Sequence, residues 1–140
     1  MSDVAVRPLP RPTLLSAPFW DACRRHQLTV QRCSACGTHV FVPRPFCPHC
    51  LGTDLQWVAS TGEGAIVTYT VVWRAQTPAF TAPYVVAVVR LSEGFEMMTN
   101  IVGCAPQQVA IGAAVRVHFV DESDEISLPC FELSNGASRP

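Results

Sequence analysis

Two Cys-x-x-Cys pairs, separated by ten residues, constrain the fold of this chain more than any other feature. Cys33 and Cys36 form the first pair and Cys47 and Cys50 the second, within the stretch CSACGTHVFVPRPFCPHC. Each pair supplies two thiolates from one tight loop, and a short hairpin between the loops can bring all four sulfur atoms to one point. The spacing predicts a four-cysteine metal site of the rubredoxin-like or zinc-ribbon type.

Zinc is the metal we expect at this site, although iron could occupy the same four sulfur atoms. A closed shell of four thiolates has no vacant position for water or substrate, so the predicted role is structural. Disulfides are the main alternative, but MSDVAVRPLPRP at the start lacks the apolar run of a secretory signal. We therefore expect a cytoplasmic protein with reduced thiols. His39 and His49 lie inside the cluster, and we assign them ordinary surface roles.

Glycines follow both pairs, at positions where the chain is expected to turn sharply. Gly37 comes directly after Cys36, and Gly52 comes two positions after Cys50. Glycine is the residue best suited to the backbone conformations of such turns.

A helix is predicted ahead of the cysteines, over residues 16–27. Ser16 is a plausible N-cap, and Pro18 falls in the first turn. Phe19 and Cys23 lie on one face, with Trp20 beside them. Two interpretations are open: the aromatic side chains pack on their own domain, or Phe19 and Trp20 project onto a partner.

The chain after Cys50 has the pattern of a β protein, so the predicted fold class is mainly β. Strands are expected over 65–74, 83–91, 95–103, 115–120 and 126–133, with a connection at 105–114, and Pro129 suggests an edge or a bulge. Five strands with a connection between the third and fourth are typical of an OB-fold barrel, although a five-stranded sandwich would give a similar pattern. The predicted organisation is a disordered arm (1–13), a helix and zinc ribbon (14–58), an OB-fold domain (59–133) and a disordered tail (134–140).

Charge and motifs limit the functions that the chain can have. The formal net charge is −1, and residues 1–50 carry six Arg against two acidic residues, whereas the remainder carries four against nine. An anionic partner is therefore expected at the N-terminal half, and no apolar run reaches the roughly 20 residues of a membrane span. Common catalytic motifs are absent from the sequence. Cys104 with His118 as its base is less favoured than two structural residues, so we predict no catalytic residue.

The order of these elements resembles one known family. A helix carrying FW, the stretch LTVQRCSACGTHVFVPRPFCPHC, the GEG before a long strand, and then PYVVAVVRL and LPCFEL resemble the DUF35 proteins over about residues 14–133. The resemblance implies a rubredoxin-like zinc ribbon joined to an acyl-CoA-associated OB fold. Its four metal-binding cysteines fall on Cys33, Cys36, Cys47 and Cys50.

The same resemblance implies a non-catalytic subunit of a thiolase-like enzyme, with two copies on an enzyme dimer and with acyl-CoA bound through the complex. An aldolase of steroid side-chain degradation is the partner that we favour. Apolar anchors surrounded by Arg suit both a protein interface and the CoA phosphates. The interface is accordingly predicted at Phe19, Trp20, Arg24, Arg25, Arg32 and Arg44.

Two other classes of function remain open at this point. OB folds and zinc ribbons also bind single-stranded nucleic acid, although the barrel half is acidic here. An iron-bearing ribbon could instead carry electrons.

Overall fold

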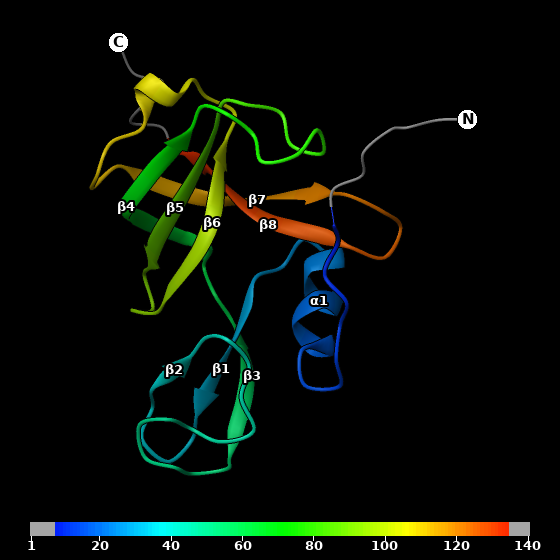
Figure 1. The fold of residues 1–140 in the computed structure, drawn as a ribbon. Coiled ribbons are helices and arrows are strands. Elements are labelled where there is room, and N and C mark those ends of the chain that lie inside the picture. Colours follow the sequence, from blue (N-terminus) through cyan, green and yellow to red (C-terminus); the bar gives the residue numbers. More distant parts are fainter. Residues whose placement is uncertain (1–7, 135–140) are drawn as a thin grey trace.

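A computed structural model describes residues 8–134 of the chain, in which a small three-stranded sheet lies below a larger barrel (Figure 1). The predicted arm and tail fall largely on residues 1–7 and 135–140, which lie outside the described residues. Within residues 8–134, no helix combines the length and the apolar character needed to cross a membrane.

The small sheet contains the cysteine pairs. It consists of β1 (Thr29–Cys33), β2 (His39–Val40) and β3 (Leu55–Ala59), all antiparallel in the order β2-β1-β3. The hairpin expected between the two cysteine loops contains only the two-residue strand β2, and the sequence pattern does not predict β3. Side chains of β3 are only half-buried or exposed, so LQWVA has no clear alternation to reveal it.

The larger unit is a closed five-stranded barrel, which confirms the OB-fold prediction and excludes the sandwich. Its strands are β4 (Glu63–Val72), β5 (Tyr84–Leu91), β6 (Glu96–Val102), β7 (Ala114–Asp121) and β8 (Ser127–Leu133), in the order β4-β5-β6-β8-β7. A short 3₁₀ helix, η1 (Pro106–Gln108), lies in the connection between β6 and β7.

The barrel wall has its shortest ladder of paired residues where β6 meets β8, and we call this junction the seam. The two strands are parallel and pair only at Ile101 with Phe131 and at Val102 with Glu132. Further along, the Thr99 hydroxyl donates a hydrogen bond of 2.8 Å to the Pro129 carbonyl. Pro129 therefore occupies a local edge inside a closed barrel, where its missing N–H costs no ladder bond to β6.

Helix α1 (Ala17–Arg24) packs against β8 of the barrel and against β1. Pro18 lies in its first turn as predicted, and Ser16 precedes the helix. The Ser16 side chain makes no capping bond, because its oxygen instead accepts hydrogen bonds from the N–H and hydroxyl of Thr13. Phe19 and Cys23 belong to one core cluster with barrel residues such as Val89 and Phe131, so the helix covers its own chain.

The GEG segment, residues 62–64, links the two units and needs its glycines for steric reasons. Gly62 has a φ of +76°, and a Cβ on Gly64 would lie 2.3 Å from the Arg90 carbonyl oxygen. No side chain fits at Gly64 without moving a strand. The Glu93 carboxylate completes the link by accepting hydrogen bonds of 2.8 Å from both the Ser60 hydroxyl and the Thr61 N–H.

Candidate functional site

The four thiols of the two Cys-x-x-Cys pairs converge at the outer end of the small sheet. All four Sγ atoms lie within 4.8 Å of one another. The distance from Cys33 to Cys50 is 3.5 Å and that from Cys36 to Cys47 is 3.7 Å, measured between sulfur atoms. Four sulfur atoms placed tetrahedrally at about 2.3 Å from a zinc ion would be separated by about 3.8 Å, so the spacing fits such an ion.

Donors around the cluster favour the thiolate form that a metal needs. Backbone N–H groups of His49 and Gly52 donate to the sulfur atoms of Cys47 and Cys50, at 3.3 and 3.4 Å. Hydrogen bonds from the side chain and backbone of Thr38 lower the pKa of Cys36 to about 6. At Cys50 the Gly52 N–H lowers the pKa, but contacts with the Cys33 and Cys36 thiols raise it more, to about 12, so one proton is shared within the cluster until a metal replaces it. Stabilised thiolates bind zinc and resist protonation.

The two turns differ from the prediction in one respect. Gly37 is left-handed, with a φ of +80°, but in the second turn the left-handed residue is Leu51, with a φ of +65°, and not Gly52. Gly52 serves another purpose, because a Cβ there would lie 3.3 Å from the Cys50 sulfur. Because glycine has no side chain, the backbone can pass close to the thiols at this position.

Cys33, Cys36, Cys47 and Cys50 would therefore hold the metal, and the ion would supply structural cross-linking only. Cys33 and Cys47 are fully buried, and with Val40 they are the only buried hydrophobic members of the ribbon's own core cluster in the described chain. So small a core cannot hold three strands together without further bonds.

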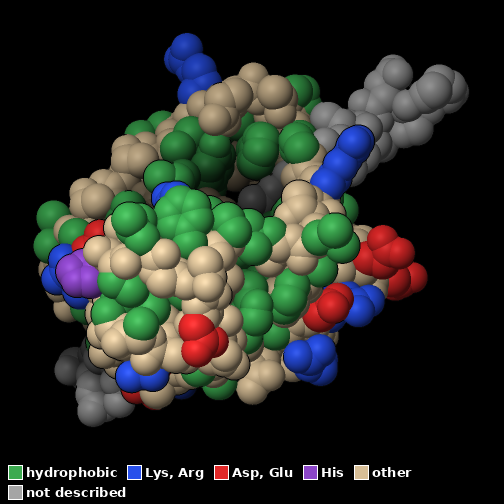
Figure 2. All heavy atoms as spheres, turned by 90° about the horizontal axis from the view of Figure 1, so that it is seen from below, with side chains coloured by type: hydrophobic (Ala, Val, Ile, Leu, Met, Phe, Trp, Pro, Cys, Tyr) green, Lys and Arg blue, Asp and Glu red, His purple; other side chains and the backbone are tan. Residues whose placement is uncertain are grey.

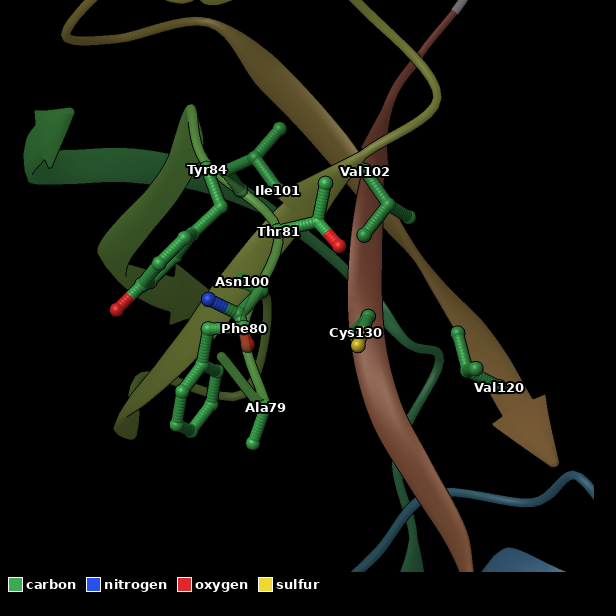
Figure 3. Close-up of a pocket in the computed structure, with 9 residues that line it drawn as sticks. All are labelled: Ala79, Phe80, Thr81, Tyr84, Asn100, Ile101, Val102, Val120 and Cys130. Atoms are coloured by element: carbon green, nitrogen blue, oxygen red, sulfur yellow. The ribbon is translucent and has the colours of Figure 1, made fainter. Parts of the chain in front are cut away.

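A second feature is a pair of apolar cavities along the seam. One cavity, of about 250 Å³, lies between Phe80 and Tyr84 on one side and Val120 and Cys130 on the other (Figure 3). The second, of about 270 Å³, is lined by Trp20, Met98 and Leu128 among others.

The two cavities are neighbours along the seam, because Asn100 and Cys130 line both of them. Among the residues that the structure describes, no Arg, Asp, Glu or His lines either cavity. A long uncharged group fits such a lining better than an anionic one.

Comparisons with known proteins agree with this architecture. Residues 20–56 match the family described as the ChsH2 rubredoxin-like zinc ribbon domain, and residues 57–120 match the ChsH2 C-terminal OB-fold domain. A DUF35 domain-containing scaffold protein of Methanocaldococcus jannaschii is 38% identical over 68% of this chain and 69% of its own length. The chain belongs to the DUF35 family.

One solved structure resembles this DUF35 chain closely. A chain of the Ltp2-ChsH2(DUF35) aldolase is 38% identical, with a TM-score of 0.82 over 89% of this chain and 98% of that chain.

Two longer relatives carry the names of enzyme subunits. A probable enoyl-CoA hydratase alpha subunit of Thermomonospora curvata is 39% identical over 91% of this chain. The 3-oxo-4,17-pregnadiene-20-carboxyl-CoA hydratase alpha subunit of Mycobacterium tuberculosis is 34% identical over 78%. The DUF35 chain spans only 40% and 35% of the lengths of these two proteins.

The residues predicted to form an interface differ in how exposed their side chains are. Phe19 is buried, at 6% exposure, and makes edge-to-face contacts with Trp20 and Phe41, so it packs within its own chain. Trp20 is half-buried. Of the four arginines, Arg24 pairs with Asp21 at 3.1 Å, and Arg25, Arg32 and Arg44 are exposed. From below, basic side chains are spread around the visible face and do not form a single patch (Figure 2).

His39 does not have the ordinary surface role that was predicted for it. Its ring is half-buried and stacks on Phe95 of the β5–β6 turn, with ring centroids 6.4 Å apart. Phe41 also stacks on Phe95, at 5.5 Å. These contacts fix the ribbon against the barrel, and no local pattern signals them because the partners are more than 50 residues apart.

Cys104 and His118, weighed as a nucleophile and base, do not form a pair. No hydrogen bond joins them within residues 8–134, and burial raises the pKa of the Cys104 thiol. His118 lies 3.9 Å from a Glu132 oxygen instead.

Proposed function

We propose that this DUF35 chain is a non-catalytic subunit that binds a thiolase-like acyl-CoA enzyme. The observation that carries the proposal is the likeness to the DUF35 chain of the Ltp2-ChsH2 aldolase over nearly the whole of that chain. The closed four-thiol cluster supports it, because a metal held there has no vacant position for a substrate. The enzyme would supply the reacting groups.

The proposed partner is an aldolase that acts on acyl-CoA thioesters, with steroid side-chain degradation as the pathway that we favour. Support comes from the aldolase named above and from the Mycobacterium tuberculosis hydratase subunit, whose name gives a steroid acyl-CoA as the substrate. We further propose two copies of this chain on an enzyme dimer, in the cytoplasm, and zinc as the metal.

Help in forming the acyl-CoA site is the second part of the proposal. The seam offers uncharged lining for the acyl portion, and Phe80 and Tyr84 stack beside it with ring centroids 5.7 Å apart. A basic groove suited to nucleic acid would need Arg along this surface. Neither seam cavity is lined by an Arg of residues 8–134, so the subunit role is favoured over single-stranded nucleic-acid binding.

Co-expression with the thiolase-like enzyme of the same organism tests the proposal. We expect a stable hetero-oligomer by size-exclusion chromatography with light scattering, and aldol cleavage only when both chains are present. An enzyme that is equally soluble and active without this chain would show that the proposal is wrong.

Filling the seam tests the acyl-CoA part separately. Ala79→Phe should raise the KM for the steroid acyl-CoA while the hetero-oligomer remains intact. An unchanged KM would remove the seam from the acyl-CoA site and leave the subunit role in place.

A further inference from the structure

The segment between Phe41 and the second cysteine pair, residues 42–46, carries apolar side chains on the outside of the ribbon. Val42 is 59% exposed and Phe46 is 43% exposed, and the exposed Arg44 lies between them. These three side chains belong to neither core cluster of the described chain. We call residues 42–46 the ribbon loop.

The ribbon loop is held rigidly although it has no regular structure. The buried side chain of Gln31 accepts a hydrogen bond of 2.8 Å from the Arg44 N–H and donates one of 3.1 Å to the Arg44 carbonyl. Pro43 and Pro45 fix φ on both sides of this clamp. A loop ordered in advance loses little conformational entropy when it binds.

Val42 has a backbone conformation that its side chain disfavours. Its φ is +39°, and a β-branched residue in the left-handed region is a clear outlier. Phe41 beside it turns inward onto Phe19 and Phe95, which ties the base of the loop to the barrel. Because Val42 itself gains little burial within the chain, the strain points to a contact outside the chain.

We propose that the ribbon loop is the anchor by which this chain docks on its partner enzyme. The matching surface is an apolar depression that receives Val42 and Phe46, with a carboxylate at its rim for Arg44. The inference rests on the proposed function for the identity of the partner. The anchor therefore consists of three exposed side chains of one preordered loop, and not of Phe19, which is buried.

Charge favours an enzyme over a second copy of this chain. Residues 1–50 carry six Arg against two acidic residues, and the balance stays positive after the net −2 of four thiolates on one divalent ion is added. Two copies meeting across a two-fold axis at the ribbon loop would bring two such basic halves together, which is unfavourable. A partner with acidic groups at its rim has the complementary charge.

Val42→Gly is the decisive variant, because it removes the anchor and relaxes the backbone. We expect the isolated variant to be at least as stable as the wild type, yet to bind the enzyme about 30-fold more weakly, as for a hot-spot residue. Phe46→Ser should weaken binding by a similar factor. Arg44→Glu should mainly slow association and reverse its salt dependence. Biolayer interferometry with the purified enzyme gives both rates.

Two exposed apolar residues on the barrel serve as matched controls. Trp73 is 64% exposed and Ile111 is 69% exposed, both outside the ribbon. Trp73→Ser and Ile111→Ser should each change Kd by less than about threefold, the range of surface contacts that do not anchor an interface. Bound metal and the circular dichroism spectrum confirm that each variant is folded.

The outcomes separate this inference from the proposed function. If the wild type binds the enzyme and Val42→Gly binds equally well, the ribbon loop is not the anchor, while the subunit role stands. If the wild type binds no thiolase-like enzyme, both fail. A concentration-dependent homodimer that Val42→Gly abolishes in analytical ultracentrifugation would assign the loop to a second copy and overturn the enzyme as its occupant.

Discussion

The ribbon and the barrel are stabilised by different means, although they lie side by side in one small chain. The barrel surrounds an apolar core that includes Ile66, Val89 and Phe131, whereas the outer ribbon has three buried hydrophobic residues, two of them cysteines. Hydrophobic burial can stabilise the barrel, but it is too small to stabilise the outer ribbon. The inner part of β1 resembles the barrel in this respect, because Val30 belongs to the barrel's cluster. The dependence on metal should therefore be confined to the outer ribbon.

Metal removal should give the largest effect. Structural zinc supplies about 10 kcal/mol or more in zinc-finger peptides. Cys47→Ser or a strong chelator should therefore unfold the outer ribbon and leave the barrel folded. Hydrogen exchange should show β2 losing protection while β5 keeps it.

Cys104→Ser is the matched control for this experiment, since Cys104 lies outside the cluster and is only half-buried. It should retain one metal ion per chain. Loss of protection across the barrel as well as the ribbon would show that the two regions unfold as one unit, contrary to the comparison. Elemental analysis of the wild type would distinguish zinc from iron.

Gly64→Ala should be the most damaging single change on the barrel side. The added methyl group would meet the Arg90 carbonyl, which is fixed in the β4–β5 ladder. We expect a loss of about 3 kcal/mol in the free energy of unfolding. Urea denaturation followed by tryptophan fluorescence measures it.

Gly94→Ala provides the comparison for Gly64. Gly94 has a φ of +101°, and a methyl group added there would have no atom of the described chain within 4 Å. The variant should lose only about 1 kcal/mol through backbone strain. Equal losses at the two glycines would mean that steric crowding at Gly64 is not the cause.

Leu51→Gly should stabilise the ribbon. Leu51 is 70% exposed and left-handed, so its side chain gains little burial while its backbone is strained. Relief of that strain, less the extra flexibility of glycine, should add about 0.5–1 kcal/mol. The midpoint of zinc release in a chelator titration reports it, and Gly37→Ala should shift the midpoint in the opposite direction. A Leu51→Gly ribbon that released zinc more easily would contradict this account.

The smallest expected effect is a pH dependence at the link between the two regions. Burial raises the pKa of Glu93, but hydrogen bonds from Thr61 and Ser60 lower it more, so the pKa lies below its ordinary value. A lowered pKa means that this contribution to stability is present above the ordinary carboxyl pKa and is lost as the pH falls through the folded-state value. Because Glu93 is only partly buried and solvent screens its charge, the contribution should be below about 1 kcal/mol.

Glu93→Gln should remove this acid-dependent contribution. The difference in unfolding free energy between wild type and variant should shrink as the pH falls below about 4, the ordinary range of a carboxyl group. A difference that stays constant from neutral to acidic pH would show that the charge of Glu93 is not involved.

The sequence alone determined the features that depend on local chemistry. Four thiols in two Cys-x-x-Cys pairs converge through two tight loops, so the spacing by itself brings Cys33, Cys36, Cys47 and Cys50 together. Alternation along the later strands likewise indicated a five-stranded β unit. In both cases the signal lies within a few neighbouring residues.

Tertiary structure decided the features that join distant segments. That Phe19 turns inward, that His39 stacks on Phe95, and that β6 and β8 leave an apolar seam all follow from contacts between residues far apart in the chain. The display of Val42 and Phe46 depends likewise on the clamp from Gln31, on a different strand. Local pattern fixes which residue types can form an element, but packing against the rest of the molecule decides which side chains remain at the surface.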